Sequence, residues 1–399
     1  MSRASTVVNK LLKLSFDTSS LLFNELRFHN HTAHHLGALY FLGENDKRIE
    51  EIYHHAMVES SDPDVPSPHT ITRANWRSIL GDRQFCKAYK DYFEQELPAE
   101  NWREKFLQIL LENEPHPLIN GVIGGVVHPL IHIGYALELD SRLVAVEALT
   151  QAAVCYDSLH DTVDKLQRPQ AGTKSPMEVF TGMRADNRLP IFEKSDIDNI
   201  ENCVKMCNDR ILQHFNQWKM NSTLEKTIED LFDVSLYIYG ATHRPNEIVF
   251  DFFLLHLLTA MHAVRVTFPY LKDPKIAEHL LLQFFYFAGV LYVNQRRPEI
   301  NEKLIDDYQL DATKTWEYVV DRAINTKLSE DSHLVKVIHT LRSAEKVYGS
   351  KNGLYLKAAV KTVDNLDLNI KHPEIDIPFP WVVAPEDPRQ AKMNALQKQ

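Results

Sequence analysis

Glycine is scarce in this chain, with 13 glycines among 399 residues, and stretches that alternate apolar and polar residues are nearly absent. Because such alternation marks half-buried β-strands, its absence argues against a β-rich architecture. Apolar residues recur instead three and four positions apart, which is the spacing of amphipathic helices. We therefore predict an all-α protein.

No linker divides the sequence, so we predict a single large multi-helix domain over residues 1–374. Residues 375–399 contain four prolines, and we expect them to form an irregular tail that is extended or disordered. The longest predicted helices cover residues 142–163, 196–218, 247–270 and 274–294.

Cysteine is rare as well, and none of the four cysteines belongs to a C-x-x-C pair. This argues against a zinc ribbon or a dithiol redox motif and favours free, buried thiols. So few cysteines suit a reducing compartment, and we expect the protein to be cytoplasmic. The first 16 residues are basic and lack acids, as in an amphipathic first helix, although a transit peptide has a similar composition.

Basic clusters and long apolar runs are also lacking. The formal net charge is −10 and the lysines and arginines do not cluster, which argues against binding to nucleic acid. The longest apolar runs, near residues 252–264 and 280–293, are shorter than a bilayer requires, so we predict no membrane span. The composition leaves the oligomeric state open.

Histidine is abundant, and several of the 19 histidines lie in apolar stretches. Neutral imidazole is a common metal ligand. The first group comprises His29, His31, His34 and His35. On a helix, His31 shares a face with His34 and His35, so that two imidazoles can converge on one ion. A polar helix start with histidines that cap the helix or face water is the alternative, and we prefer it for His29.

The second group, His128 and His132, lies in the apolar segment 124–135. Pro129 disfavours helical geometry at His128, which places His128 at a helix entrance and His132 on the first turn. Both rings are expected to be buried, and each ring nitrogen then needs a partner. A metal ion, a carbonyl or a carboxylate would serve, and for either residue alone a hydrogen-bonded core histidine is the simpler interpretation.

His256 stands by itself in segment 250–259, which is apolar nearly all round. Such a helix belongs in a protein core. An imidazole in that setting needs a specific partner, and this favours a functional role for His256.

His333 and Lys336 are three residues apart on one helical face, beside an apolar stripe. Lysine normally extends to water. A buried lysine, however, gives up its proton more easily. Lys336 would then be suited to catalysis, or to taking up carbon dioxide as a carbamate that offers an oxygen ligand to a metal.

Four segments, 29–43, 124–139, 250–260 and 331–342, resemble in order the motif blocks of the questin oxidase-like family. The resemblance extends over most of the chain. The family includes fungal enzymes that oxidise polyketide-derived anthraquinones and related aromatics, some by ring opening of the Baeyer–Villiger type. The resemblance implies a helical oxidoreductase, an oxygenase that takes dioxygen and an aromatic, quinone- or polyketide-like small molecule. It also implies NADPH as electron donor.

The resemblance further implies a set of site residues, because the family's motif blocks contain His31, His34, His128, His256, His333 and Lys336. Activation of dioxygen requires a flavin, a metal or an unusually acidic substrate. No dinucleotide fingerprint is present. We therefore expect iron, held by imidazoles and one oxygen donor, although imidazole also suits zinc, copper and nickel.

Two further histidines are expected to support this site. His35 and His132 are alternative ligands, or residues that orient the ligands. We assign catalytic roles to Lys336 and His132.

Three other functions are compatible with the sequence. The first is an NADPH-dependent monooxygenase without a metal. The second is a non-catalytic helical protein that binds an apolar ligand. The third is histidine-based hydrolysis without redox chemistry. Metal content, dioxygen uptake and tolerance to loss of the histidines would separate them.

Overall fold

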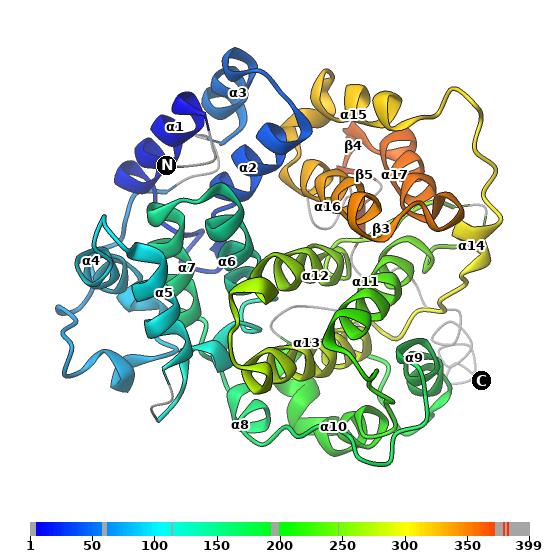
Figure 1. The fold of residues 1–399 in the computed structure, drawn as a ribbon, viewed down its shortest axis with the longest axis horizontal. Helices are drawn as coiled ribbons and strands as arrows, with labels where there is room; N and C mark the ends of the chain where they lie inside the picture. Colours follow the sequence, from blue (N-terminus) through cyan, green and yellow to red (C-terminus); the bar gives the residue numbers. More distant parts are fainter. Residues whose placement is uncertain are drawn as a thin grey trace, which may run out of the picture. The chain divides into compact units, whose positions relative to one another are not determined.

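The computed structural model describes residues 5–57, 62–112, 115–192, 199–245, 247–371, 378–379 and 381–382. Over these residues the chain folds into 17 α-helices, short 3₁₀ or π turns, and six short strands (Figure 1). The strands pair only into three two-stranded ribbons within this described part. The prediction of an all-α fold is confirmed.

The chain forms two compact units, and each unit draws on several stretches of sequence. Unit 1 comprises residues 1–165, 262–276 and 320–339, and unit 2 comprises residues 166–261, 277–319 and 340–399. Because the segments interleave, no single linker separates the units. The predicted boundary between residues 374 and 375 remains a prediction.

Most elements of unit 1 come from the first 165 residues. They are α1 (Thr6–Thr18), β1 (Leu22–Phe23), β2 (Phe28–His29), α2 (Thr32–Leu42), α3 (Asp46–Ile52), η1 (Tyr53–Met57), η3 (Trp76–Ile79), η4 (Arg83–Phe85), α4 (Cys86–Glu96), α5 (Trp102–Leu111), η5 (Leu118–Gly121), α6 (His128–Leu139), α7 (Arg142–Val154) and α8 (His160–Val163). Later in the sequence come η7 (Phe268–Tyr270) and η8 (Lys327–Glu330).

Four helices contribute residues to both units: α12 (Leu255–Thr267), α13 (Pro274–Asn294), α15 (Trp316–Ile324) and α16 (Ser332–Tyr348). The other elements of unit 2 are α9 (Pro176–Ala185), α10 (Ile200–Phe215), α11 (Leu224–Gly240), β3 (Phe250–Asp251), α14 (Lys303–Asp306), η9 (Lys351–Gly353), α17 (Leu354–Asn365), β4 (Asp367–Lys371), β5 (Pro378–Phe379) and β6 (Trp381–Val382).

The core of unit 1 is built around α6 and α7, which lie side by side (Figure 1). Every residue of α6 except Glu138 is buried, and α7 is buried from Val144 to Val154. A helix that is covered on all sides must be apolar almost throughout, as these two are. The polar side chains of α6 therefore lie inside the protein, where each needs a partner.

Local sequence signals set the ends of the helices that carry the histidines. The Asn30 side chain accepts a hydrogen bond from the Thr32 backbone N–H at 2.8 Å. Helix α2 ends at Leu42, and Gly43 follows it in a left-handed conformation. At the start of α16, Asp331 Oδ1 accepts from the backbone N–H groups of His333 and Leu334. Backbone groups at the end of α2 and at the start of α16 thus have hydrogen-bond partners.

Helix α13 spans the residues predicted for it, 274–294. By length and composition alone, this helix could cross a membrane. The apolar run 280–293 seen in the sequence is shorter than the helix that contains it. In its most apolar window, 83% of the residues are buried inside the protein, which is typical of a core helix.

Of the predicted tail, 375–399, the structure describes only β5 and β6. Strand β5 pairs antiparallel with β4, and β6 pairs in parallel with β3. These residues are extended, as expected, and the rest of the tail lies outside the described residues.

Helices α6 and α12 approach closely at Gly134. A Cβ atom at this position would lie 2.6 Å from Cβ and 2.7 Å from Cα of Ala263. We expect Gly134→Ala to lower the stability by about 1–3 kcal/mol, because the backbones must separate. Gly182→Ala in α9 is the control, since its added methyl would meet its nearest atom at 3.4 Å. Thermal unfolding should show a lower apparent Tm for Gly134→Ala only; equal Tm values would contradict the close approach.

Candidate functional site

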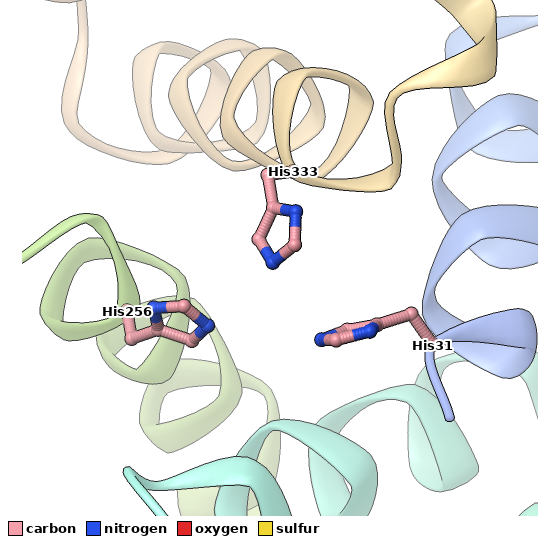
Figure 2. Close-up of side chains that lie close together, drawn as sticks. All are labelled: His31, His256 and His333. Atoms are coloured by element: carbon pink, nitrogen blue, oxygen red, sulfur yellow. The ribbon is translucent and has the colours of Figure 1, made fainter. Parts of the chain in front are cut away.

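Three imidazoles from distant parts of the sequence meet in unit 1. His31 immediately precedes α2, His128 begins α6, and His333 lies on the first turn of α16. Nε2 of His31 is 2.9 Å from Nε2 of His128. A ring nitrogen of His31 also lies within 4.8 Å of one on His333. Figure 2 shows the His31 and His333 rings turned toward the same space.

A strained loop places His128. Gly125, Val126 and Val127 all have positive φ angles, of 53°, 54° and 57°. This conformation is costly for a β-branched valine, so the surrounding structure must enforce it. The loop brings the Gly125 carbonyl to 2.7 Å from Nδ1 of His128. A carbonyl can only accept a hydrogen bond, so Nδ1 carries the proton and the lone pair of Nε2 faces His31.

The 2.9 Å separation of the two Nε2 atoms fits two chemical arrangements. One is a hydrogen bond that His31 donates to His128. The other is a pair of ligands on one ion, because neighbouring ligand atoms lie roughly 3 Å apart when each metal–nitrogen bond is roughly 2.1 Å. The geometry therefore needs little adjustment to hold a metal.

His34 and Lys336 add polar atoms that lack partners. Both side chains are fully buried, at 0% exposure. Neither ring nitrogen of His34, nor Nζ of Lys336, has a hydrogen-bond partner among the residues that the structure describes. Unpaired polar atoms in an interior are costly, which makes them candidates for contact with a bound group.

His35 and His132, in contrast, already have partners. Nε2 of His35 donates to the Ser329 carbonyl at 2.7 Å. His132 lies 2.9 Å from Glu147 through Nε2 and 3.2 Å from the Gln151 amide through Nδ1. These contacts fit residues that support the site better than they fit ligands.

Burial sets the protonation of this cluster. Loss of hydration lowers the pKa of His128 to about 3 and that of His35 to about 4, and it lowers the pKa values of His31 and His34 well below their usual range. The charge of Lys336 lowers them further. At neutral pH these four imidazoles are therefore uncharged, the form that binds metals.

Lys336 is itself changed by its surroundings. Burial lowers its pKa to about 7, against a smaller opposing effect of the Asp331 carboxylate. Near neutral pH the side chain is then divided between ammonium and free amine. The free amine is the nucleophilic form.

His256 belongs to unit 2, at the start of α12. The residue is buried, as its apolar segment predicts, and Nδ1 donates to the Phe252 carbonyl at 3.0 Å. That hydrogen bond leaves Nε2 as the nitrogen with the lone pair. Its role as a ligand remains a prediction.

The expectation that His29 caps a helix or faces water is wrong. His29 lies in β2, is 6% exposed, and stacks on the His128 ring at 4.3 Å between centroids. Its Nε2 is 3.3 Å from the Cys155 thiol. The polar neighbours of His29 in the sequence gave no sign of this burial, which depends on pairing between β1 and β2.

A second polar cluster, Glu138 with His262 and His339, was not anticipated from the sequence. Glu138 and His262 interrupt apolar helical stretches, which is a signal in the sequence, whereas His339 has several polar neighbours. The chain also has exposed histidines, and composition alone does not distinguish a buried imidazole from a solvated one. The sequence therefore does not single out this cluster.

Comparison with known proteins gives these residues a family context. A family model described as questin oxidase-like matches residues 28–341. The chain is 23% identical to the Baeyer-Villiger monooxygenase AacuH of Aspergillus aculeatus, over 87% of this chain and 79% of that protein. It is 25% identical to the oxidoreductase AflY of Aspergillus parasiticus (83% and 71%) and 21% identical to the questin oxidase of Aspergillus fumigatus (86% and 82%).

Buried neutral histidines predict a marked loss of stability in acid. The unfolded chain binds protons at a histidine pKa near 6.5, whereas His35 and His128 in the folded protein have pKa values of about 4 and 3. Stability is therefore full above about pH 7 and falls as the pH drops below 6.5, by about 2 kcal/mol at pH 5 for each such histidine.

The apparent Tm of metal-free protein, measured in chelator from pH 8 to pH 5, checks this. His35→Gln should flatten the dependence, and His54→Gln, at an exposed position, should leave it unchanged. A wild-type Tm that is independent of pH over this range would show that the imidazoles are not buried as neutral groups.

Proposed function

The chain belongs to the questin oxidase-like family, and on this premise we propose that it is an oxygenase whose dioxygen chemistry depends on a metal held by the histidines of unit 1. The family and the relatives make it an oxidoreductase of the questin oxidase and Baeyer–Villiger type. Its substrate, in this proposal, is an aromatic, quinone- or polyketide-like small molecule.

One observation carries the proposal: the 2.9 Å approach of two neutral imidazoles, with a third close by, in an apolar interior. We assign His31, His128 and His333 as the ligands, and iron as the metal. When bound, iron would supply the one-electron chemistry with dioxygen that amino-acid side chains lack. Imidazole ligands alone would also accept zinc, copper or nickel, so the assignment of iron follows from the reaction class.

Lys336 is suited to complete this ligand set with oxygen. Its free amine can attack carbon dioxide; a nitrogen–carbon bond forms, one carbon–oxygen π bond opens to an anionic oxygen, and the amine proton leaves to solvent. The resulting carbamate is an oxygen donor. The lowered pKa of Lys336 and the lack of any hydrogen-bond partner for Nζ among the described residues both support this role.

His34 has a different place in the proposal. The ring of His34 contacts the ring of His132, at 4.7 Å between centroids, and the ring of Tyr135, at 5.2 Å. With both nitrogens unpaired among the described residues, His34 can bind the ion or form a hydrogen bond with a bound phenol. Glu147 and Gln151 hold His132, and its ring packs edge-on against that of His34, which would restrict how the His34 ring can turn.

The NADPH-dependent, metal-free monooxygenase remains the second candidate. Family resemblance favours NADPH, and the chain has no dinucleotide fingerprint that would hold it. In the proposed enzyme NADPH would serve as a donor of electrons. A non-catalytic carrier for an apolar ligand is the third candidate, and it would consume no dioxygen.

Removal of a ligand should abolish both metal binding and turnover. We expect His128→Ala to lose stoichiometric iron and to reduce dioxygen uptake with hydroxylated anthraquinones by more than about a hundredfold, because even residues that merely support a ligand are worth 10–100-fold. Elemental analysis of the purified protein and an oxygen electrode provide the two measurements.

His54→Ala is the matched control, since this histidine is exposed and lies outside the cluster. It should retain iron and activity. Wild-type activity that survives chelation and depends on NADPH would identify the metal-free monooxygenase instead, and substrate binding without any dioxygen uptake would identify the carrier.

A further inference from the structure

A second cluster of metal-binding side chains lies in unit 1, apart from the three histidines described above. It joins Glu138 of α6, His262 of α12 and His339 of α16. Oε2 of Glu138 is 2.9 Å from Nε2 of His262 and 3.1 Å from Nε2 of His339. All three ligand atoms lie within 4.8 Å of one another.

The chemical composition of this cluster is that of a transition-metal site. Two imidazoles and one carboxylate on separate helices form the donor set of many non-haem iron sites and of some zinc sites. Distances of 2.9 and 3.1 Å between ligand atoms match the roughly 3 Å spacing that metal–ligand bonds of roughly 2.1 Å impose.

The charges of Glu138 and His262 also suit a metal. Burial alone would raise the pKa of Glu138, but the imidazoles of His262 and His339 overcome this effect and hold it well below its usual range. Burial lowers the pKa of His262 to about 4, despite the neighbouring carboxylate. An ionised carboxylate therefore lies beside a neutral imidazole at neutral pH, as metal binding requires.

Tyr135 lies between the two clusters. Its ring stacks on His34 at 5.2 Å between centroids and approaches His339 at 6.2 Å. The second cluster shares no residue with the group of His31, His128 and His333, and the Tyr135 ring contacts both His34 and His339.

We propose that Glu138, His262 and His339 form a second metal site, which binds a divalent first-row transition ion. The ligand atoms are Oε2 of Glu138 and the two Nε2 atoms. This site does not depend on the proposed function, because none of its ligands takes part in the first cluster.

Arg265 makes the proposal specific. Its Nη2 donates to Nδ1 of His262 at 3.1 Å, and arginine can only donate. Nδ1 must then be unprotonated, and the proton lies on Nε2, the atom that would bind the metal. Metal binding therefore requires the proton to move to Nδ1 and Arg265 to turn away. Glutamine at this position would instead accept a hydrogen bond from Nδ1–H and favour the metal-binding tautomer.

Cobalt(II) is a suitable probe, because its visible absorption reports on coordination by protein ligands. The titration uses the full chain with His31→Ala and His160→Ala. Among the described residues, these changes remove one residue from the His31 cluster and one from the surface group of His116, His160 and Asp164. We expect one cobalt ion per chain in this background. Adding Arg265→Gln should tighten binding by about 10–100-fold, and adding His262→Asn should abolish it.

Glu138→Gln provides a second test of the ligand set. It is needed if circular dichroism shows that His262→Asn does not fold. It keeps the shape of the side chain but removes its charge, and we expect at least a tenfold weaker binding, on the order of the effect of a ligand-supporting residue. Failure of the background variant to bind cobalt, or binding that Arg265→Gln and Glu138→Gln leave unchanged, would overturn the proposal and leave a hydrogen-bonded clamp between helices. Loss of iron in His128→Ala does not enter this test.

Discussion

The structure of the site depends on the cost of charging an imidazole in an apolar interior. Helix α6 is buried on every side, and His128 at its first position can share that environment only as a neutral ring. One hydrogen bond, from Nδ1 to the Gly125 carbonyl, then decides which nitrogen keeps its lone pair. The strained loop before α6 is the means by which that carbonyl is brought into position.

The same constraint explains why polar side chains occur in groups here. A neutral imidazole still has one donor and one acceptor, and each needs a partner away from water. His132 finds both in Glu147 and Gln151, on the neighbouring helix α7. His31 and His128 face each other, and in the proposed site one ion would be bound by both of their Nε2 atoms. Burial thus determines both the charge and the tautomer of these imidazoles.

Much of this could be predicted from local sequence. Pro129 indicated that His128 stands at a helix entrance, and the spacing of His333 and Lys336 placed both on one face of α16. Long-range features could not be predicted in this way. The helix predicted over residues 142–163 is interrupted after Val154, where the chain turns at Cys155 before α8. Burial of His29 follows from a strand pairing of two residues, which has no periodic signal in the sequence.

In the proposed site, His31 and His128 share one metal ion through their Nε2 atoms. Crystals of the protein grown with iron, measured on both sides of the iron absorption edge, test it directly by anomalous diffraction. We expect an anomalous peak roughly 2 Å from both nitrogens. The contrary result is a map in which iron fully occupies another position, no peak lies here, and the two Nε2 atoms are still 2.9 Å apart. It would show that a hydrogen bond joins the two histidines in place of a metal centre.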